Sequence, residues 1–259
     1  MAFVGIDAGA QSIKVVILKR GNNFFSKVVH GKEEETFVDG GMLEDILKES
    51  GLSYKEVFSI LATGVGKNTA SIADKKKSEQ ICHARGAYWI FPSVRTVLDI
   101  GAEGSRAMKL GEAGRVVDFT VNSKCAAGTG IFLEAMAKIM ELSVEEMGQL
   151  AVETAGKARI SSYCAVFAES EVISNIHKGI PKEHIISGIH ESVVDRLVEL
   201  LNIVKIEEDL VVCGGVAKNI SVIKALEKRI DLKVWVPEKP EIVGALGAAL
   251  IAQDLYQKT

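Results

Sequence analysis

The chain has 259 residues, of which 25% are charged and 47% hydrophobic, and its formal net charge is −3. This composition is ordinary for a globular protein and gives no electrostatic reason to expect a nucleic-acid partner. No apolar stretch approaches the ~20 residues of a membrane helix, and the first residues lack the basic start and apolar core of a signal peptide. We therefore expect a cytoplasmic protein without a membrane partner.

The N-terminal part of the chain begins with a predicted β-hairpin. Residues 3–7 form an apolar strand that ends in Asp7, residues 8–12 form a glycine-containing turn, and residues 13–18 form a second strand. A helix, a strand and a second helix follow, expected at Gly41–Ser50, Ser59–Ala62 and Thr69–Ile90. The basic run at residues 75–77 is then expected on the solvated face of the second helix.

The hairpin pattern recurs later in the chain. Residues 95–99 form another apolar strand that ends in Asp99, and a turn at residues 100–104 precedes strands at 105–110 and 116–121. The segment Asp7-x-Gly-Ala-Gln aligns with Asp99-x-Gly-Ala-Glu. The shared strand-turn-strand context predicts two related halves that face one cleft.

The rest of the second half is mainly helical. Helices are expected at Gly130–Glu141, at Ala165–Lys178 and from Pro181 to Val204, and a capping box at Ser143–Glu146 predicts the start of one more. Strands are expected at Leu210–Cys213 and Lys233–Val236, and a last helix begins near Gly244. The chain has four prolines and no linker-like segment. We expect two tightly joined lobes, formed by residues 1–94 and 95–242.

Three glycine-containing turns suit the phosphates and metal of a nucleotide. Glycines allow close approach of the backbone and provide amides for phosphate oxygens. Asp7 and Asp99 each end a strand beside such a turn and could hold Mg²⁺ mainly through water. Gln11 or Glu103 could orient an attacking water. The candidate phosphate-binding residues of the first two turns are Gly9, Ala10, Gln11, Ser12, Lys14, Gly101 and Ala102.

The third turn, Gly214-Gly215, follows a strand and opens a helix, which suits a ribose, adenine or α-phosphate contact. Its candidate binding residues are Gly214, Gly215, Val216, Lys218 and Asn219. Any one turn could equally be a simple hairpin or tight turn, but the three together favour nucleotide binding. The chain has neither a P-loop motif nor the glycine motif of a Rossmann dinucleotide site after its first strand.

The four cysteines fall into two pairs. Cys82 and Cys213 lie in apolar patterns typical of buried packing. Cys125 and Cys164 each precede a predicted helix, where free amides and the helix dipole favour the thiolate. A cubane iron–sulfur cluster needs four thiolates, so a two-fold dimer could share one; two unrelated core cysteines are the alternative. After Cys125, the residues Gly128, Thr129 and Gly130 are further candidates for cofactor binding.

The three turns together resemble the fold of actin, hexokinase and the heat-shock ATPases. Their two phosphate hairpins are similar to Asp7–Ser12 and Asp99–Glu103, and their adenosine turn is similar to Val211–Val216. The resemblance implies an α/β protein with two duplicated lobes that open and close on ATP. It also implies that the C-terminal helix, residues 243–259, returns to pack on the first lobe.

Four segments closely resemble the activators of 2-hydroxyacyl-CoA dehydratases, a family that includes the ATP-binding subunits of benzoyl-CoA reductase. These segments are Ala62–Gly66, Lys124–Leu133, Val166–Ser174 and Gly214–Asn219. The resemblance implies a homodimer bridged by one [4Fe–4S] cluster, held by Cys125 and Cys164 of each subunit. It further implies ATP-driven transfer of one low-potential electron to a partner iron–sulfur dehydratase or reductase, with a ferredoxin or flavodoxin as donor.

The second turn departs from the pattern of the dehydratase activators. Their turn commonly reads Asp-Ile-Gly-Gly-Gln-Asp, whereas this chain has Glu103 and Gly104 at the last two positions. This turn, with His83–Ala87 upstream, is more similar to the reductase subunits. Two other functions fit the same fold: a small-molecule kinase, which needs a substrate-activating aspartate in the cleft, and a nucleotide-binding assembly protein without iron.

Overall fold

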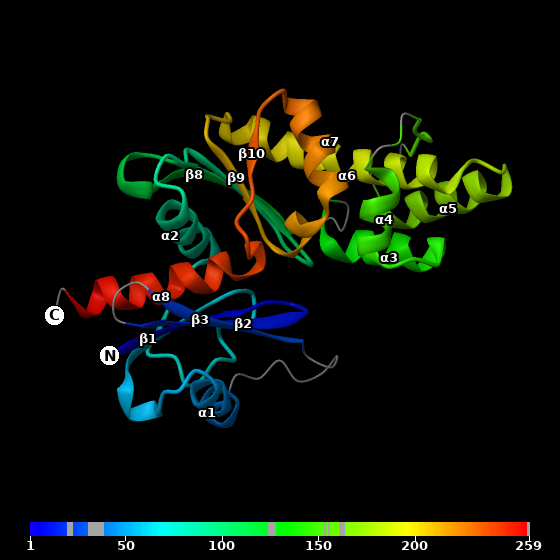
Figure 1. The fold of residues 1–259 in the computed structure, drawn as a ribbon. Coiled ribbons are helices and arrows are strands. Elements are labelled where there is room, and N and C mark those ends of the chain that lie inside the picture. Colours follow the sequence, from blue (N-terminus) through cyan, green and yellow to red (C-terminus); the bar gives the residue numbers. More distant parts are fainter. Residues whose placement is uncertain are drawn as a thin grey trace.

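The computed structural model describes residues 1–19, 23–30, 39–123, 128–152, 154, 156–160 and 164–257. Two five-stranded sheets lie on either side of a layer that contains two helices (Figure 1). Cys125 and its neighbours at residues 124–127 lie outside the described residues. Within the described part of the chain, no helix combines the length and apolar character needed to cross a membrane.

The first sheet has the strand order β3-β2-β1-β4-β5. Its strands are β1 (Ala2–Ala8), β2 (Ser12–Lys19), β3 (Phe24–His30), β4 (Val57–Thr63) and β5 (Lys75–Lys76). Every residue of β1 is buried, because helix α1 (Gly40–Glu49) covers one face of the sheet and helix α8 (Val243–Tyr256) covers the other. Burial on both faces explains why β1 is a continuous apolar run up to Asp7.

The second sheet repeats this topology in the order β8-β7-β6-β9-β10. Its strands are β6 (Thr96–Ile100), β7 (Ser105–Leu110), β8 (Val116–Asn122), β9 (Leu210–Cys213) and β10 (Val234–Trp235). In both sheets the first two strands pair antiparallel and the first also pairs parallel with the strand on its other side. The expected duplication is confirmed.

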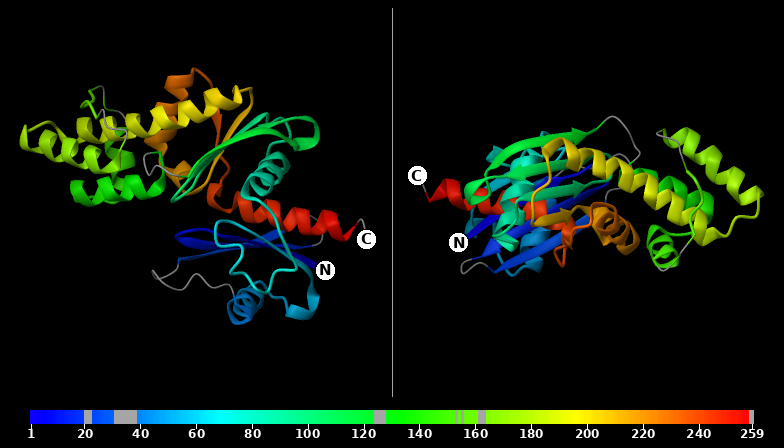
Figure 2. Two further views of the ribbon diagram at one scale, coloured as in Figure 1. Left: turned by 180° about the vertical axis from the view of Figure 1, so that it is seen from behind. Right: turned by 90° about the horizontal axis from the view of Figure 1, so that it is seen from above.

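Helices lie on the outer face of the second sheet and beyond its edge, and among the described residues they bury a large apolar core. They are α3 (Gly130–Met140), α4 (Val144–Ala151), α5 (Ala165–His177), α6 (Lys182–Val204) and α7 (Ile220–Ile230). Figure 2 shows α3, α5 and part of α6 extending together beyond the sheet. Short 3₁₀ helices occur at Tyr54–Glu56, Glu112–Gly114, Gly215–Lys218 and Pro240–Ile242.

Helices α2 (Glu79–Ile90) and α8 form the layer between the sheets and touch through their backbones. A Cβ atom added to Gly247 would lie 1.7 Å from the carbonyl oxygen of Cys82, and one added to Gly86 would lie 2.2 Å from that of Val243. On the other side of α8, a Cβ atom at Gly5 of β1 would lie 1.9 Å from the carbonyl oxygen of Ala245. Glycine is therefore required where these three elements meet.

The predicted helix at Thr69–Ile90 is wrong over its first ten residues. Helix α2 begins at Glu79 after the N-cap Ser78, and the basic run provides the edge strand β5 instead of a helix face. Asp74 holds the preceding segment to the sheet, because its carboxylate accepts a hydrogen bond of 2.7 Å from the backbone N–H of Ile60. Strand β3 was not predicted.

Candidate nucleotide cleft and exposed cysteine

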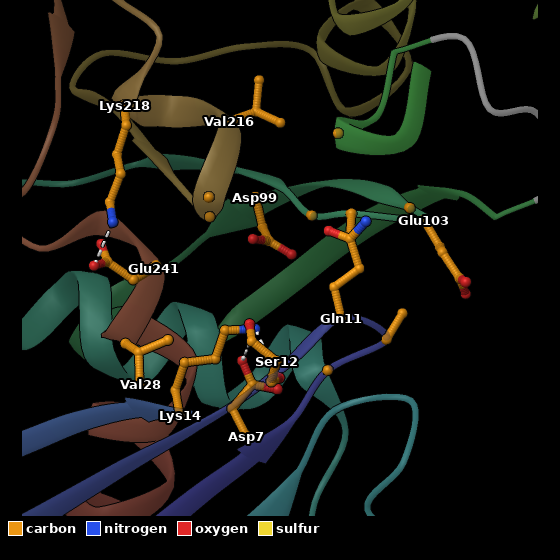
Figure 3. A pocket seen from close by; sticks show the side chains of 18 of the residues that line it. Asp7, Gln11, Ser12, Lys14, Val28, Asp99, Glu103, Val216, Lys218 and Glu241 are labelled. Carbon is orange, nitrogen blue, oxygen red and sulfur yellow. Dashed lines mark hydrogen bonds and ion pairs between the residues drawn. The ribbon is translucent and has the colours of Figure 1, made fainter. Parts of the chain in front are cut away.

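A cleft with a volume of ≈ 510 Å³ lies between the two sheets and brings all three glycine turns together (Figure 3). The ends of β1 and β6 provide its two aspartates, Asp7 and Asp99. The third turn, after β9, faces them from the second lobe. The duplicated topology is what places two similar hairpin turns opposite each other.

The first turn joins β1 to β2. Asp7 is 6% exposed, and Lys14 is its cross-strand partner, with Nζ 4.0 Å from Oδ2 of Asp7. Lys14 Nζ also donates to the carbonyl oxygen of Ser12 at 3.2 Å, and the amide of Gly9 donates to the same oxygen at 3.1 Å. The turn therefore holds one carboxylate and one ammonium group at the floor of the cleft.

The second turn repeats this arrangement with a tighter ion pair. Asp99 is 3% exposed, and its cross-strand partner Arg106 donates from Nη1 to Oδ2 at 2.8 Å. On the other side, Nε2 of His83 lies 3.3 Å from Oδ1 of Asp99. The amide of Gly101 closes the turn by donating to the carbonyl oxygen of Gly104 at 2.8 Å.

Arg106 joins the buried Asp99 to the half-buried Glu79. Its Nη2 lies 2.6 Å from Oε1 of Glu79 on α2, in addition to its bond to Asp99. Burial acts to lower the pKa of Arg106, but the negative charges of Asp99 and Glu79 outweigh burial and raise it. Burial also raises the pKa of Glu79 above its ordinary value, against the opposing charge of Arg106. The guanidinium thus stays charged and shared between both carboxyl groups.

A glycine in the left-handed region covers each aspartate. Gly64 follows β4 with φ +93°, and a Cβ atom there would lie 2.6 Å from Oδ1 of Asp7. Gly214 follows β9 with φ +89°, and a Cβ atom there would lie 2.6 Å from Oδ1 of Asp99. Both positions require glycine for conformation and for space.

The third turn is held from both sides. The amide of Gly214 donates to the carbonyl oxygen of Pro240 at 2.9 Å, and Lys218 pairs with Glu241 at 2.6 Å. The Asn219 side chain accepts from two backbone amides at the start of α7, at 3.2 and 3.1 Å. Its carbonyl oxygen is therefore used within the protein as a helix cap.

A smaller hollow of ≈ 180 Å³ lies beside this turn, between residues 215–220 and helix α4. Gly215, Val216 and Lys218 line both this hollow and the main cleft. The capping box that was predicted for α4 is present, with Ser143 and Glu146 bonded reciprocally. The cap fixes the end of the helix that forms one wall of the hollow.

The remaining candidates of the cleft lie at its mouth or behind it. Gln11 and Glu103 are exposed on the two turns. Gly130 lines the cleft and its amide donates to the carbonyl oxygen of Gly101 at 2.9 Å. Gly128 and Thr129 are not among the cleft-lining residues; Thr129 is fully buried as the N-cap of α3.

Among the described cysteines, Cys164 alone is exposed, at the N-cap of α5. The next residues are also exposed: Val166 to 68% and Phe167 to 66%. Cys82 and Cys213 are buried, as expected. Burial raises the pKa of Cys82 to about 12 and that of Cys213 well above its ordinary value, so both remain thiols.

Several charged cleft residues were not predicted from the sequence. These are Glu79, His83, Arg106, Glu134 and Glu241. Arg106 could have been found, because it follows Asp99 by the same seven positions that separate Lys14 from Asp7. Glu79 and His83 are four positions apart and so share one helix face. We find no sequence pattern that singles out Glu134 or Glu241.

A family model covers almost the whole chain. The BadF/BadG/BcrA/BcrD ATPase family model matches residues 4–252. The chain belongs to this ATPase family. The 2-hydroxyisocaproyl-CoA dehydratase activator of Clostridioides difficile is 40% identical over 254 residues, which cover 98% of this chain and 96% of that protein.

Two further members show the breadth of the family. The (R)-2-hydroxyglutaryl-CoA dehydratase activating ATPase of Acidaminococcus fermentans is 41% identical over 250 residues, with 96% of each chain covered. One component of the benzoyl-CoA reductase of Thauera aromatica is 34% identical over 272 residues, with 98% of this chain and 94% of that component covered. Over the full chain, identity is thus higher to these activators than to the reductase component.

Solved structures confirm the fold. The activator of the 2-hydroxyisocaproyl-CoA dehydratase from Clostridium difficile with bound ADPNP superimposes with a TM-score of 0.94 at 39% identity, covering 100% of this chain and 96% of that one. A glucokinase of the ROK family from Streptomyces griseus superimposes with a TM-score of 0.57 at 10% identity, covering 98% of this chain and 100% of that one. The family member therefore has the two-lobed fold that the turns predicted.

Proposed function

We propose that this ATPase-family member is an activator that uses ATP to transfer one low-potential electron to a partner iron–sulfur enzyme. The observation that carries the proposal is the exposed thiol of Cys164 at a helix N-terminus, while the other described cysteines are buried in the core. Relatives of the chain are named as activators of acyl-CoA dehydratases, which supports a dehydratase or a related reductase as the acceptor.

ATP is proposed to bind with its phosphates at the first two turns and its adenosine at the third. Gly9, Ala10, Gln11, Ser12, Lys14, Gly101 and Ala102 would contact the phosphates, and Gly214, Gly215, Val216, Lys218 and Asn219 would form the adenosine side. The ≈ 180 Å³ hollow beside α4 is the natural extension of the cleft for the base. The relative with bound ADPNP supports a nucleotide in this fold.

The charges of the cleft support Mg²⁺ as the companion of ATP. The described lining residues include seven carboxyl groups (Asp7, Glu79, Asp99, Glu103, Glu134, Glu145 and Glu241) and three lysine or arginine side chains (Lys14, Arg106 and Lys218). A polyphosphate would be repelled by this excess of acids unless a divalent cation accompanied it. Asp7 and Asp99 would hold the ion, mainly through water, as Mg²⁺ prefers.

Hydrolysis at this site would follow the usual in-line course. The oxygen of a water bonds to the γ-phosphorus while the bond from phosphorus to the β–γ bridging oxygen breaks, which leaves ADP and inorganic phosphate with release of a proton. Gln11 and Glu103 lie on the first two turns and line the cleft, so both are candidates for orienting the water.

Cys164 and Cys125 of two copies are proposed to hold one [4Fe–4S] cluster, which when bound supplies a one-electron redox centre. The fit of Cys164 rests on its exposed thiol and on the free amides of the α5 N-terminus. The exposed Val166 and Phe167 next to it are apolar, as expected of residues that a second copy covers. A ferredoxin or flavodoxin is the proposed donor.

Closure of the lobes is proposed to connect the two sites. We take residues 1–94 as one lobe, with the helix of residues 243–259 packed against it, and residues 95–242 as the other. Helix α3 starts at Gly130, which is bonded to the second turn, and the segment that contains Cys125 immediately precedes it. ATP can drive such a change only by binding the two arrangements with different affinity.

Anaerobic purification with iron and sulfide analysis tests the proposal. We expect four irons per two chains in the wild type, and loss of iron in Cys164→Ser with ADP binding retained. Cys213→Ala is the matched control, because its thiol is fully buried in the core and out of reach of a second copy, and it should retain the iron. Iron-free wild type after reconstitution, or a fully loaded Cys164→Ser variant, would contradict the cluster assignment.

A further inference from the structure

A hydrogen bond crosses the mouth of the cleft between the two lobes. Nε2 of Gln11, on the first turn, donates to Oε2 of Glu134 on α3 at 2.7 Å, although the residues are 123 positions apart. Both side chains line the cleft and both are exposed. An exposed bond of this kind stabilises a fold by ~1 kcal/mol or less, so its main consequence is to orient the side-chain amide of Gln11.

The chemistry of the acceptor fixes which way the amide of Gln11 faces. An ionised carboxylate can only accept hydrogen bonds, so the NH₂ group must point to Glu134 and the carbonyl oxygen Oε1 must point away from it. Figure 3 shows Gln11 reaching into the cleft with this oxygen on the side of Asp99. Glu103, by contrast, points away from both aspartates in the same view.

The position of Glu134 is itself tied to the second turn. The amides of Gly130 and Ile131 donate to the carbonyl oxygens of Gly101 and Ala102, each at 2.9 Å. Glu134 lies one helical turn after Gly130 on the same helix. Helix α3 is thus bonded through its backbone to one phosphate turn and through Glu134 to the other.

We propose that Glu134 is a positioning residue for ATP hydrolysis. It holds the amide of Gln11 so that Oε1 accepts a hydrogen bond from the water that attacks the γ-phosphorus, as the bond to the β–γ bridging oxygen breaks and ADP and phosphate form. Gln11, and not Glu103, is then the group that touches the water. This inference rests on the hydrolysis of ATP proposed above.

Phosphate release from MgATP by the purified protein, together with ADP affinity, tests this role. Glu134→Ala should lower kcat about tenfold, since a freely rotating amide no longer presents its oxygen, and should leave KM and the Kd of ADP within about twofold. Glu134→Gln should restore most of kcat, because its carbonyl oxygen can still accept from Gln11. Lys138→Ala, on an exposed position one turn further along α3, is the control and should behave as the wild type.

A double-mutant cycle separates positioning from a general effect on the cleft. Gln11→Ala should lower kcat at least as much as Glu134→Ala, and adding Glu134→Ala to Gln11→Ala should change kcat no further. Additive losses, an unchanged kcat in Glu134→Ala, or a change confined to KM and Kd would overturn the role of Glu134 while ATP hydrolysis by the wild type stands. A wild type that releases no phosphate would overturn the proposed hydrolysis and this inference together.

Discussion

Gly214 and Gly215 are adjacent glycines of the third turn, yet the structure predicts that substitution by alanine destabilises the fold at Gly214 and not at Gly215. At Gly214, with φ +89°, a Cβ atom would lie 2.3 Å from the carbonyl oxygen of Ile100 and 2.6 Å from Oδ1 of Asp99. At Gly215, a Cβ atom meets nothing within 4 Å. The pair therefore provides a test and its control at neighbouring positions of one loop.

The expected magnitude for Gly214→Ala follows from two terms. A left-handed conformation costs an L-residue ~1–2 kcal/mol, and overlap with atoms that cannot move away costs ~1–3 kcal/mol. Together they predict a loss of about 2–5 kcal/mol in the free energy of unfolding. For a chain of this size that corresponds to a fall in Tm of about 10 °C. Gly215→Ala should melt within about 2 °C of the wild type, because neither term applies.

Thermal unfolding without nucleotide, followed by circular dichroism, measures the difference directly. Calorimetric titration with MgADP then reports on the cleft: Gly215→Ala should fold normally but bind ADP more weakly, because its methyl group occupies space at the proposed adenosine site. Equal melting temperatures for the two variants would refute the argument that the third turn requires glycine at position 214, where it covers Asp99.

Two further predictions concern buried charge. Burial lowers the pKa of His190 to about 4, so between pH 6.5 and 4 the unfolded chain binds a proton that the folded chain does not. The free energy of unfolding must then decrease as the pH falls through this window. Between pH 7 and pH 5, the free energy of unfolding measured in urea should fall by about 2 kcal/mol more for the wild type than for His190→Gln. Parallel pH profiles of the two proteins would contradict this. Arg106→Gln should lower the free energy of unfolding by about 3 kcal/mol, since it leaves the buried Asp99 and the half-buried Glu79 without their cation. Urea unfolding at pH 7 measures the loss, and wild-type stability would contradict the shared ion pair.

Elements with a strong local pattern could be predicted from the sequence. The apolar run before Asp7 and its repeat before Asp99 located both central strands, and the capping box at Ser143 located the start of α4. The start of α2 could not be found in this way. Residues 75–76 form a strand only because β4 offers an unpaired edge beside them, which is a tertiary effect that local propensity does not contain.

The cleft residues that could be predicted are those in the strand-turn-strand pattern that occurs twice in the chain. Asp7 and Asp99 were found because the same five-residue pattern occurs twice, and Arg106 stands where the repeat has Lys14. Glu134 lies outside the repeated strand-turn-strand pattern, and only the fold brings it to Gln11. Contacts between distant segments of this kind leave no trace in residue spacing.

Helix α8 packs on the first sheet and α2 packs on the second, so the glycine contacts between them limit how the two sheets can move relative to each other. At Gly247 and Gly86 the two helices already meet backbone to backbone, so no compressible side chains separate them. Sliding α2 along α8 would drive carbonyl groups into Cα atoms and is strongly resisted. The contact between α2 and α8 can therefore serve as an axis about which the two sheets rotate. The opening of the cleft proposed above would then be a rotation about this axis, in which a small change at the three turns becomes a larger displacement at the far ends of α3 and α5.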